Sequence, residues 1–442
     1  MRADRAAVAA AVLLTAGCAD PPPAPATPSP APRLIGAGGC SARGCHGRLE
    51  PDPAGRRWPT AFTEWVRWDR HGAAYHTLRG PLSQTIIAKL RAGGSAWNDA
   101  PDEPRCLACH VTPALANLSD SPGALRLRYD GVGCEACHTD PGRDTADWIG
   151  PHQTGWKGGR LAESYVQHGM RWLGDAKHRA EACVGCHVGA PATGGVPARE
   201  VTHDLIAAGH PRLFFDYLTF LDRLPPHWSE DKRNTKDGSP RPAETSLGAW
   251  SAGQMAAAKA GLDLYADRCK RAAGGAAVWP ELADLSCFAC HHELGQKPGD
   301  RANVWDGTLG PRLPEPLVRV LGWQDDPQYR KLAATGLVSR NRAGPLGDLA
   351  ASLSGRLNSP LQPEFGALRA VPRALDWDTA AQMYYALRAA DRDKKAAAGP
   401  LEALAKKLRL PRGPDLANSP INYDPAAVRD LLEMASEAIT GR

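Results

Sequence analysis

Several features that often reveal a protein's function are missing from this sequence. No internal stretch is apolar for long enough to span a bilayer, and no phosphate-binding glycine loop, catalytic-triad spacing or nucleic-acid-binding motif is present. Methionine is scarce, with 5 residues in 442, and no histidine or cysteine follows His292. These absences argue against a channel, a nucleotide-binding enzyme or a nucleic-acid-binding protein. Histidine and cysteine, the side chains most suited to metal binding, therefore all lie in the part of the chain that ends at His292.

The N-terminus has the pattern of an export signal. Arg2 and Arg5 provide a short basic start, residues 6–16 are apolar, and small residues precede Cys18. This pattern resembles a bacterial lipoprotein signal, which predicts a signal peptide at 1–17 and lipidation of Cys18. Thr15 stands where such signals usually have leucine, so cleavage by an ordinary signal peptidase is the alternative. We expect an exported, periplasmic or cell-surface protein that is lipid-anchored through a proline-rich linker at residues 18–35.

Five segments end in a cysteine followed directly by histidine. Four have the spacing Cys-x-x-Cys-His, and the first has four residues between its cysteines. The motifs are Cys40/Cys45/His46, Cys106/Cys109/His110, Cys134/Cys137/His138, Cys183/Cys186/His187 and Cys287/Cys290/His291. Two thiols at this spacing reach the two vinyl groups on one edge of a haem, and the histidine then binds the iron as proximal ligand. The motifs predict five covalently bound haem c groups.

Other uses of these cysteines fit the pattern less well. Disulfides are common in exported proteins, and paired cysteines with histidine can also bind zinc. Zinc motifs seldom place histidine immediately after the second cysteine, and a disulfide needs no histidine at all. Once the five motifs and Cys18 are assigned, only Cys269 remains, and we expect it to be a buried free thiol in a helix at 246–271.

The second axial ligand decides what a haem with a proximal histidine can do. A second histidine gives a low-spin electron carrier, whereas an open position permits chemistry on a substrate. Nine histidines lie outside the motifs, so histidine is sufficient for all five haems, and methionine is a poor competitor. The nine are His71, His76, His152, His168, His178, His203, His210, His227 and His292.

Local sequence separates these candidates. His203 and His210 are seven residues apart, which would place them on one face of a helix. We expect His152 and His227 to lie in a loop and a turn, and His292 to serve a haem other than that of His291. His76, His168 and His178 are interpreted as ordinary surface or hydrogen-bonded histidines.

These motifs together resemble the cytochrome c554 family and its multihaem relatives. The similar stretches run from about Gly36 to Leu294, and include Asp69-Arg70-His71, Gly131-Val-Gly-Cys134, Gly150-Pro151-His152 and His203 to Leu213. The resemblance implies a mostly α-helical fold around closely packed haems, with electron transfer as the activity. It also supports His71, His152, His203, His210 and His292 as distal ligands, with His227 in reserve. The fifth motif and the residues after 300 depart from the family pattern.

The remainder of the chain is expected to be α-helical. Apolar periodicity predicts helices at 346–357, 378–391, 401–408 and 425–439, the last with Asp424 as N-cap and Pro425 at its first position. We therefore predict a pentahaem domain at 36–300 and a helical C-terminal region at 301–442. That region could pack on the haem domain as a cap, or provide a docking surface for a partner.

The function predicted from these features is electron relay between redox proteins outside the cytoplasm. The partners would be other redox proteins and the membrane that holds the lipid anchor. The net charge of +5 does not indicate nucleic-acid binding, because arginine and lysine can pair with haem propionates. The alternatives are a multihaem oxidoreductase, acting on a small nitrogen or sulfur compound at one five-coordinate haem, and a zinc-binding structural lipoprotein. A Cys-x-x-Cys-Lys motif, as in haem nitrite reductases, is absent.

Overall fold

The computed structural model describes most of the chain after residue 33. Contacts separate residues 1–31 from residues 32–442, and every described residue belongs to the second unit. The described residues are 34–51, 58–116, 122–140, 143, 145–154, 166–227, 246–285, 287, 290–291, 313–335, 339–358, 365–392, 394–408 and 423–441. Cys18 and His292 lie outside them. The described part is mostly α-helical, as predicted, and its only β structure is three isolated bridges.

The helices before residue 224 are short, and three of them end on a motif histidine. The α-helices are α1 (Ala61–Trp68), α2 (Ala74–Thr77), α3 (Pro81–Ala92), α4 (Pro104–His110), α5 (Pro122–Arg128), α6 (Cys134–His138), α7 (Thr145–Thr154), α9 (Ala176–His187), α10 (His203–Ala208) and α11 (Tyr217–Arg223). Helix α4 shows how such a helix is fixed, because Glu103 caps its N-terminus and Pro104 occupies its first position. Each motif histidine at a helix end is thereby oriented by a short helix.

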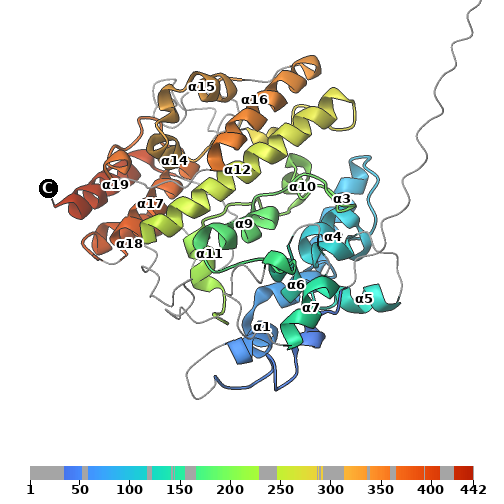
Figure 1. Cartoon of the computed structure of the whole chain (residues 1–442). Helices are drawn as coiled ribbons and strands as arrows, with labels where there is room; N and C mark the ends of the chain where they lie inside the picture. The colour runs from blue at the N-terminus through green and yellow to red at the C-terminus, as the bar shows by residue number, and fades with distance from the viewer. Residues whose placement is uncertain are drawn as a thin grey trace, which may run out of the picture. The chain divides into compact units, whose positions relative to one another are not determined.

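One long helix, α12 (Ser246–Ala273), runs between the short helices that precede it in the chain and the C-terminal helices that follow it. It packs against α9 on one side and α16 (Ala343–Gly355) on the other (Figure 1). Gly347 permits the close approach of α16, since a Cβ at that position would lie 2.9 Å from Cβ of Cys269. Cys269 is fully buried and free, as predicted.

Four C-terminal helices agree with the sequence-based predictions to within a few residues, namely α16, α17 (Trp377–Asp391), α18 (Ala398–Lys407) and α19 (Pro425–Thr440). Two further helices, α14 (Glu315–Val320) and α15 (Pro327–Ala333), were not predicted. Asp424 caps α19 by accepting hydrogen bonds from the backbone N–H groups of Ala426 and Ala427. Apolar side chains of α17, α18 and α19 form one buried cluster, and those of α12, α14, α15 and α16 form another.

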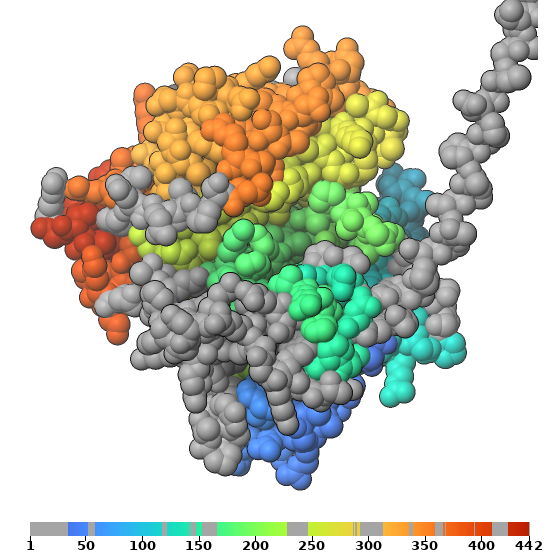
Figure 2. Space-filling view, in the orientation of Figure 1, coloured from blue at the N-terminus to red at the C-terminus, as the bar shows by residue number. Residues whose placement is uncertain are grey.

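Figure 2 shows the C-terminal helices and residues 34–70 at opposite ends of this face, with residues 176–223 between them. Among the described helices, none is both long enough and apolar enough to cross a membrane. Helices α4, α6 and α9, which end on motif histidines, lie on one side of α12, whereas the C-terminal helices cover its other side and one of its ends (Figure 1).

Candidate functional site: five histidine pairs

Each motif histidine faces one histidine from outside the motifs. The ring centroids of the two partners lie 5.9 to 6.5 Å apart in all five cases. The pairs are His46–His152 at 5.9 Å, His187–His71 at 6.0 Å, His138–His227 at 6.4 Å, His291–His203 at 6.4 Å and His110–His210 at 6.5 Å. No histidine is used twice, so the five motifs have five separate partners.

This separation fits two imidazoles on opposite sides of one metal ion. A metal–nitrogen bond of about 2 Å, with the nitrogen about 1.1 Å from its ring centroid, places the two centroids about 6.3 Å apart. Packed aromatic rings also have centroids roughly 4.5–7 Å apart, so one distance alone would not be diagnostic. The one-to-one pairing of motif with non-motif histidines is the stronger observation. The ten side chains therefore fit a haem iron with two histidine ligands at each motif.

Hydrogen bonds orient half of these rings through Nδ1. The contacts are His46 to the Trp58 carbonyl at 2.8 Å, His71 to Asp69 Oδ1 at 2.8 Å, His110 to the Ala74 carbonyl at 3.0 Å, His210 to the Pro211 carbonyl at 2.7 Å and His227 to the Pro225 carbonyl at 3.3 Å. Carbonyl and carboxylate oxygens only accept, so Nδ1 carries the hydrogen and donates. In the neutral ring the lone pair is then on Nε2, as is usual for histidines that bind a metal.

Burial keeps most of the paired histidines neutral, which is the form that binds a metal. It lowers the pKa of His138 to about 3, helped by the charge of His227, and the pKa of His187 to about 4, helped by His71. Burial also lowers the pKa values of His110, His152, His210 and His227. His71 differs, because the lowering of its pKa by burial is more than offset by its hydrogen bond to Asp69 together with the negative charges of Asp69 and Cys186, so that its pKa is raised.

The structure brings together most of the predicted distal ligands. His71, His152, His203 and His210 each face a motif histidine, and so does His227, which the resemblance had placed in reserve. Their role as iron ligands stays a prediction, as does that of His292, which lies outside the described residues.

The histidines interpreted as ordinary have other neighbours. His178 Nδ1 lies 2.7 Å from Asp175, and the His76 ring contacts Tyr129 with centroids 5.8 Å apart. His168, the third of this group, is described in no pair with a motif histidine and has an interaction partner of its own. The separation into ligand candidates and ordinary histidines is therefore consistent with the described geometry.

Two expectations about local structure were wrong. His203 and His210 do not share a helical face, because α10 ends at Ala208 and Gly209 takes the left-handed conformation with φ 119°. They consequently serve different pairs, with His291 and His110. His152 was expected in a loop, but it lies inside α7, directly after Pro151. Pro151 is the seventh of the ten residues of α7, inside the helix rather than in its first turn, so it donates no backbone hydrogen bond there.

Cysteines of different motifs lie next to one another. The thiols of Cys40 and Cys134 hydrogen-bond, and so do those of Cys109 and Cys186. Cys137 is close enough to Cys183 and Cys186 for their charges to interact. The first motif therefore adjoins the third, the third adjoins the fourth, and the fourth adjoins the second.

The fifth motif differs from the three before it in how its cysteines are held. Cys287 and Cys290 are both exposed, as is Cys45 of the first motif, whereas the cysteines of the second, third and fourth motifs are half-buried. A single turn sets the local geometry, because the backbone N–H groups of Cys290, at 3.3 Å, and His291, at 2.8 Å, both donate to the Cys287 carbonyl. Cys290 is therefore not enclosed in a core. The rest of the protein contacts this turn at Cys287, through Arg212, and at His291, through His203. Its attachment to a haem stays a prediction that rests on the motif.

Several residues that the sequence did not single out position these motifs. Buried Glu135 accepts hydrogen bonds from the backbone N–H groups of Ile35, at 2.8 Å, and Gly36, at 3.0 Å, which ties the chain before Cys40 to α6. Gly131 has φ 61°, and a Cβ there would lie 2.4 Å from the His71 carbonyl oxygen, so only glycine fits. Gly131 belongs to a stretch that the family resemblance had highlighted, which was the one signal available for it.

A structural zinc site is not supported. Among the described residues, no three histidine, cysteine, aspartate or glutamate side chains converge as metal ligands would. All eleven cysteines of the described part are free rather than joined in disulfides. The described cysteines therefore remain available for attachment of another group.

Comparison with known protein families gives a match in the first third of the chain. Residues 43–139 match the family described as cytochrome c554 and c-prime. The matched segment contains His46, His71 and the complete motifs that end at His110 and His138. No curated protein matches the chain, and no solved structure matches it. The match confirms the family resemblance over this segment and supports a haem-based electron-transfer protein.

Proposed function

Because part of the chain carries the sequence of a c-type cytochrome family, we propose that the protein is a pentahaem cytochrome that relays electrons between redox partners outside the cytoplasm. The observation that carries the proposal is the pairing of all five motif histidines with five others at 5.9 to 6.5 Å. Four motifs have the usual Cys-x-x-Cys-His spacing, and the first motif, Cys40, Cys45 and His46, has a longer loop between its cysteines.

The motif cysteines would hold each haem by thioether bonds, and the paired histidines would supply its two axial ligands. When bound, such a haem supplies a reversible one-electron couple at iron. The chain's own residues keep both imidazoles neutral and oriented. Two strong ligands leave no coordination position for a substrate, so the arrangement favours a relay over catalysis on a small molecule.

The contacts between motif cysteines support a continuous order of sites. They link the first, third, fourth and second motifs in that sequence. The segment from His203 to His210 then joins the second motif to the one that ends at His291, because its two ends face His291 and His110. We propose that electrons pass along the order first, third, fourth, second, fifth, in either direction. Cys45 of the first motif and both cysteines of the fifth motif, Cys287 and Cys290, are exposed, which agrees with haems at the two ends of this order, where partners would exchange electrons.

Export and lipid anchoring at Cys18 are part of the same proposal, and they rest on the N-terminal sequence alone. Haem attachment to Cys-His motifs requires thiols that are not joined as disulfides, which agrees with the free cysteines of the described part. Redox proteins near the same membrane surface are the proposed partners.

Mass spectrometry of the intact protein tests the haem count. The mature chain should carry five covalent haems, and replacing Cys40 and Cys45 by alanine should remove one of them. A count of four in the unaltered protein would reject the first motif as an attachment site. A colourless protein that binds zinc would reject the proposal as a whole.

A further inference from the structure

Arg212 lies at the boundary between the fifth motif and the C-terminal helices. Its Nη1 is 3.8 Å from Sγ of Cys287, the first cysteine of that motif. The same nitrogen donates to Oδ2 of Asp378 at 2.9 Å, and Nη2 donates to Oδ1 of the same carboxylate. Asp378 lies in the first turn of α17, so this guanidinium connects the C-terminal region directly to a haem-attachment cysteine.

The environment of Arg212 holds its charge in place. The side chain is 13% exposed, and its guanidinium carbon lies 5.1 Å from the ring centroid of Trp377 and 5.7 Å from that of Phe214. Its Nε is buried and has no hydrogen-bond partner among the described residues. Arginine stays charged at any pH a protein tolerates. A fixed positive charge and its carboxylate partner therefore lie beside the fifth motif at a place partly shielded from solvent.

We propose that the Arg212–Asp378 pair sets the reduction potential of the fifth haem, so that α17 of the C-terminal region controls one end of the electron relay. The inference rests on the proposed function, since it requires a haem attached at Cys287. Reduction adds an electron, so a nearby positive charge favours the reduced state and a nearby negative charge opposes it. Arg212 should therefore raise this potential and Asp378 should lower it.

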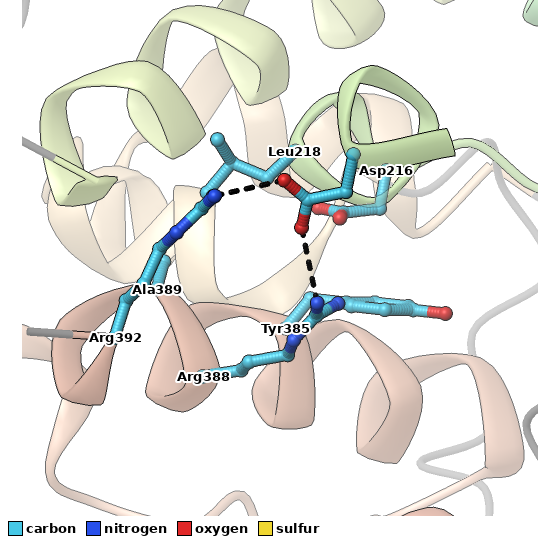
Figure 3. A pocket seen from close by; sticks show the side chains of 7 residues that line it. Asp216, Leu218, Tyr385, Arg388, Ala389 and Arg392 are labelled. Carbon is cyan, nitrogen blue, oxygen red and sulfur yellow. Dashed lines mark hydrogen bonds and ion pairs between the residues drawn. The ribbon is translucent and has the colours of Figure 1, made fainter. Parts of the chain in front are cut away.

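The same helix offers a matched control. Asp222 of α11 pairs with Arg388 at 3.1 Å and Arg392 at 2.9 Å, both at the C-terminal end of α17 (Figure 3). This cluster also joins that end of α17 to the haem-binding part of the chain, but its hydrogen bonds and ion pairs among the described residues involve no motif cysteine. Asp222→Asn removes a similar carboxylate from a similar interface, and it should leave all five potentials unchanged.

The test is a spectroelectrochemical titration of the full haem-loaded protein and of three variants, Arg212→Gln, Asp378→Asn and the double variant. Arg212→Gln should lower one of the five components and Asp378→Asn should raise the same one. Each shift should be about tenfold in the reduction equilibrium, which is about 59 mV for one electron. The double variant should lie near the original value. Asp378 is 43% exposed, so asparagine can replace it without burying an unpaired group.

Opposite signs are the discriminating result. Looser packing would expose the haem to water in either single variant and would shift the potential in the same direction in both. Shifts of equal sign, no shift, or an equal shift in Asp222→Asn would overturn the inference. Should Arg212→Gln fail to fold, Asp378→Asn against Asp222→Asn still decides the question.

Removal of the fifth motif identifies the component that moves. Alanine at both Cys287 and Cys290 should leave four haems, and in that background Asp378→Asn should shift nothing. A persistent shift would reject the assignment. Haem counts by mass are taken for every protein first. Five haems with unmoved potentials contradict this inference alone, whereas a missing haem in the unaltered protein contradicts the proposed function.

Discussion

The haem-binding part and the C-terminal part of this chain are built in different ways. Residues 313–441 form helices whose apolar faces bury one another, with side chains such as Leu404 and Leu432 fully enclosed. Residues 34–227 form mostly short helices, and beside their apolar clusters they hold nearly all of the paired histidines and most of the motif cysteines. The comparison teaches that apolar side chains account for the packing of the C-terminal helices. In residues 34–227 the convergence of histidine pairs and cysteines is an arrangement that a bound cofactor would explain.

The largest expected effect comes from producing the chain without haem attachment. Ligand binding and folding are coupled where a site has little apolar core of its own. We expect amides of α4, α6 and α9 to lose protection in hydrogen exchange, while those of α18 and α19 keep it. Equal loss in both regions would show that the C-terminal helices also depend on the haems.

The next effect tests whether His227 or His292 is the distal ligand of the haem bound by His138. His227→Ala should convert one haem in five from low spin to high spin, because His138 loses the partner that faces it. His178→Ala should change nothing, since that ring contacts Asp175 instead. Electron paramagnetic resonance of the oxidised variants measures both. A high-spin signal in His292→Ala, but not in His227→Ala, would reverse the assignment.

A smaller effect tests the packing of α16 against α12. Gly347→Ala should lower the free energy of unfolding by about 1–3 kcal/mol, because the new methyl group would meet Cys269 and the Ala266 carbonyl. Gly344→Ala, in the same helix, meets nothing within 4 Å and should be neutral or stabilise by up to about 1 kcal/mol. Denaturant unfolding of both variants provides the comparison. Equal changes in the free energy of unfolding for the two variants would show that Gly347 is not where α16 approaches α12 most closely.

The smallest effect concerns the cap of α4. Burial would raise the pKa of Glu103, but hydrogen bonds from Arg105 and two backbone N–H groups hold it below its ordinary value of 4.5. The carboxylate therefore stabilises the fold above pH 4.5, and this contribution is lost as the pH falls through the lowered pKa. Glu103→Gln should lower the free energy of unfolding by about 1 kcal/mol at about pH 7, as loss of a cap does. The difference should shrink in acid, and a constant difference would contradict the role of the charge.

Motif spacing and apolar periodicity were enough to predict the helical class and four of the six C-terminal helices. The family resemblance favoured four of the five histidines that face a motif histidine, and it placed the fifth, His227, in reserve. The end of α10 was missed although the local sequence signals it, because Gly209 followed by Pro211 is typical of a helix end, and this separates His203 from His210. Elsewhere the predictions failed where tertiary contacts decide. That His227 is the ring facing His138 depends on contacts across the fold. Arg212 was missed because its partners are distant in sequence, at Cys287 and Asp378.

Spin quantification of the oxidised protein by electron paramagnetic resonance tests the central claim most directly. If each motif histidine shares its iron with the histidine that faces it, all five ferric haems should be low spin. Addition of nitric oxide or hydroxylamine to the oxidised protein should leave their spectra unchanged. A high-spin ferric haem that binds either compound would contradict the five-pair account and would indicate an enzyme with one open haem.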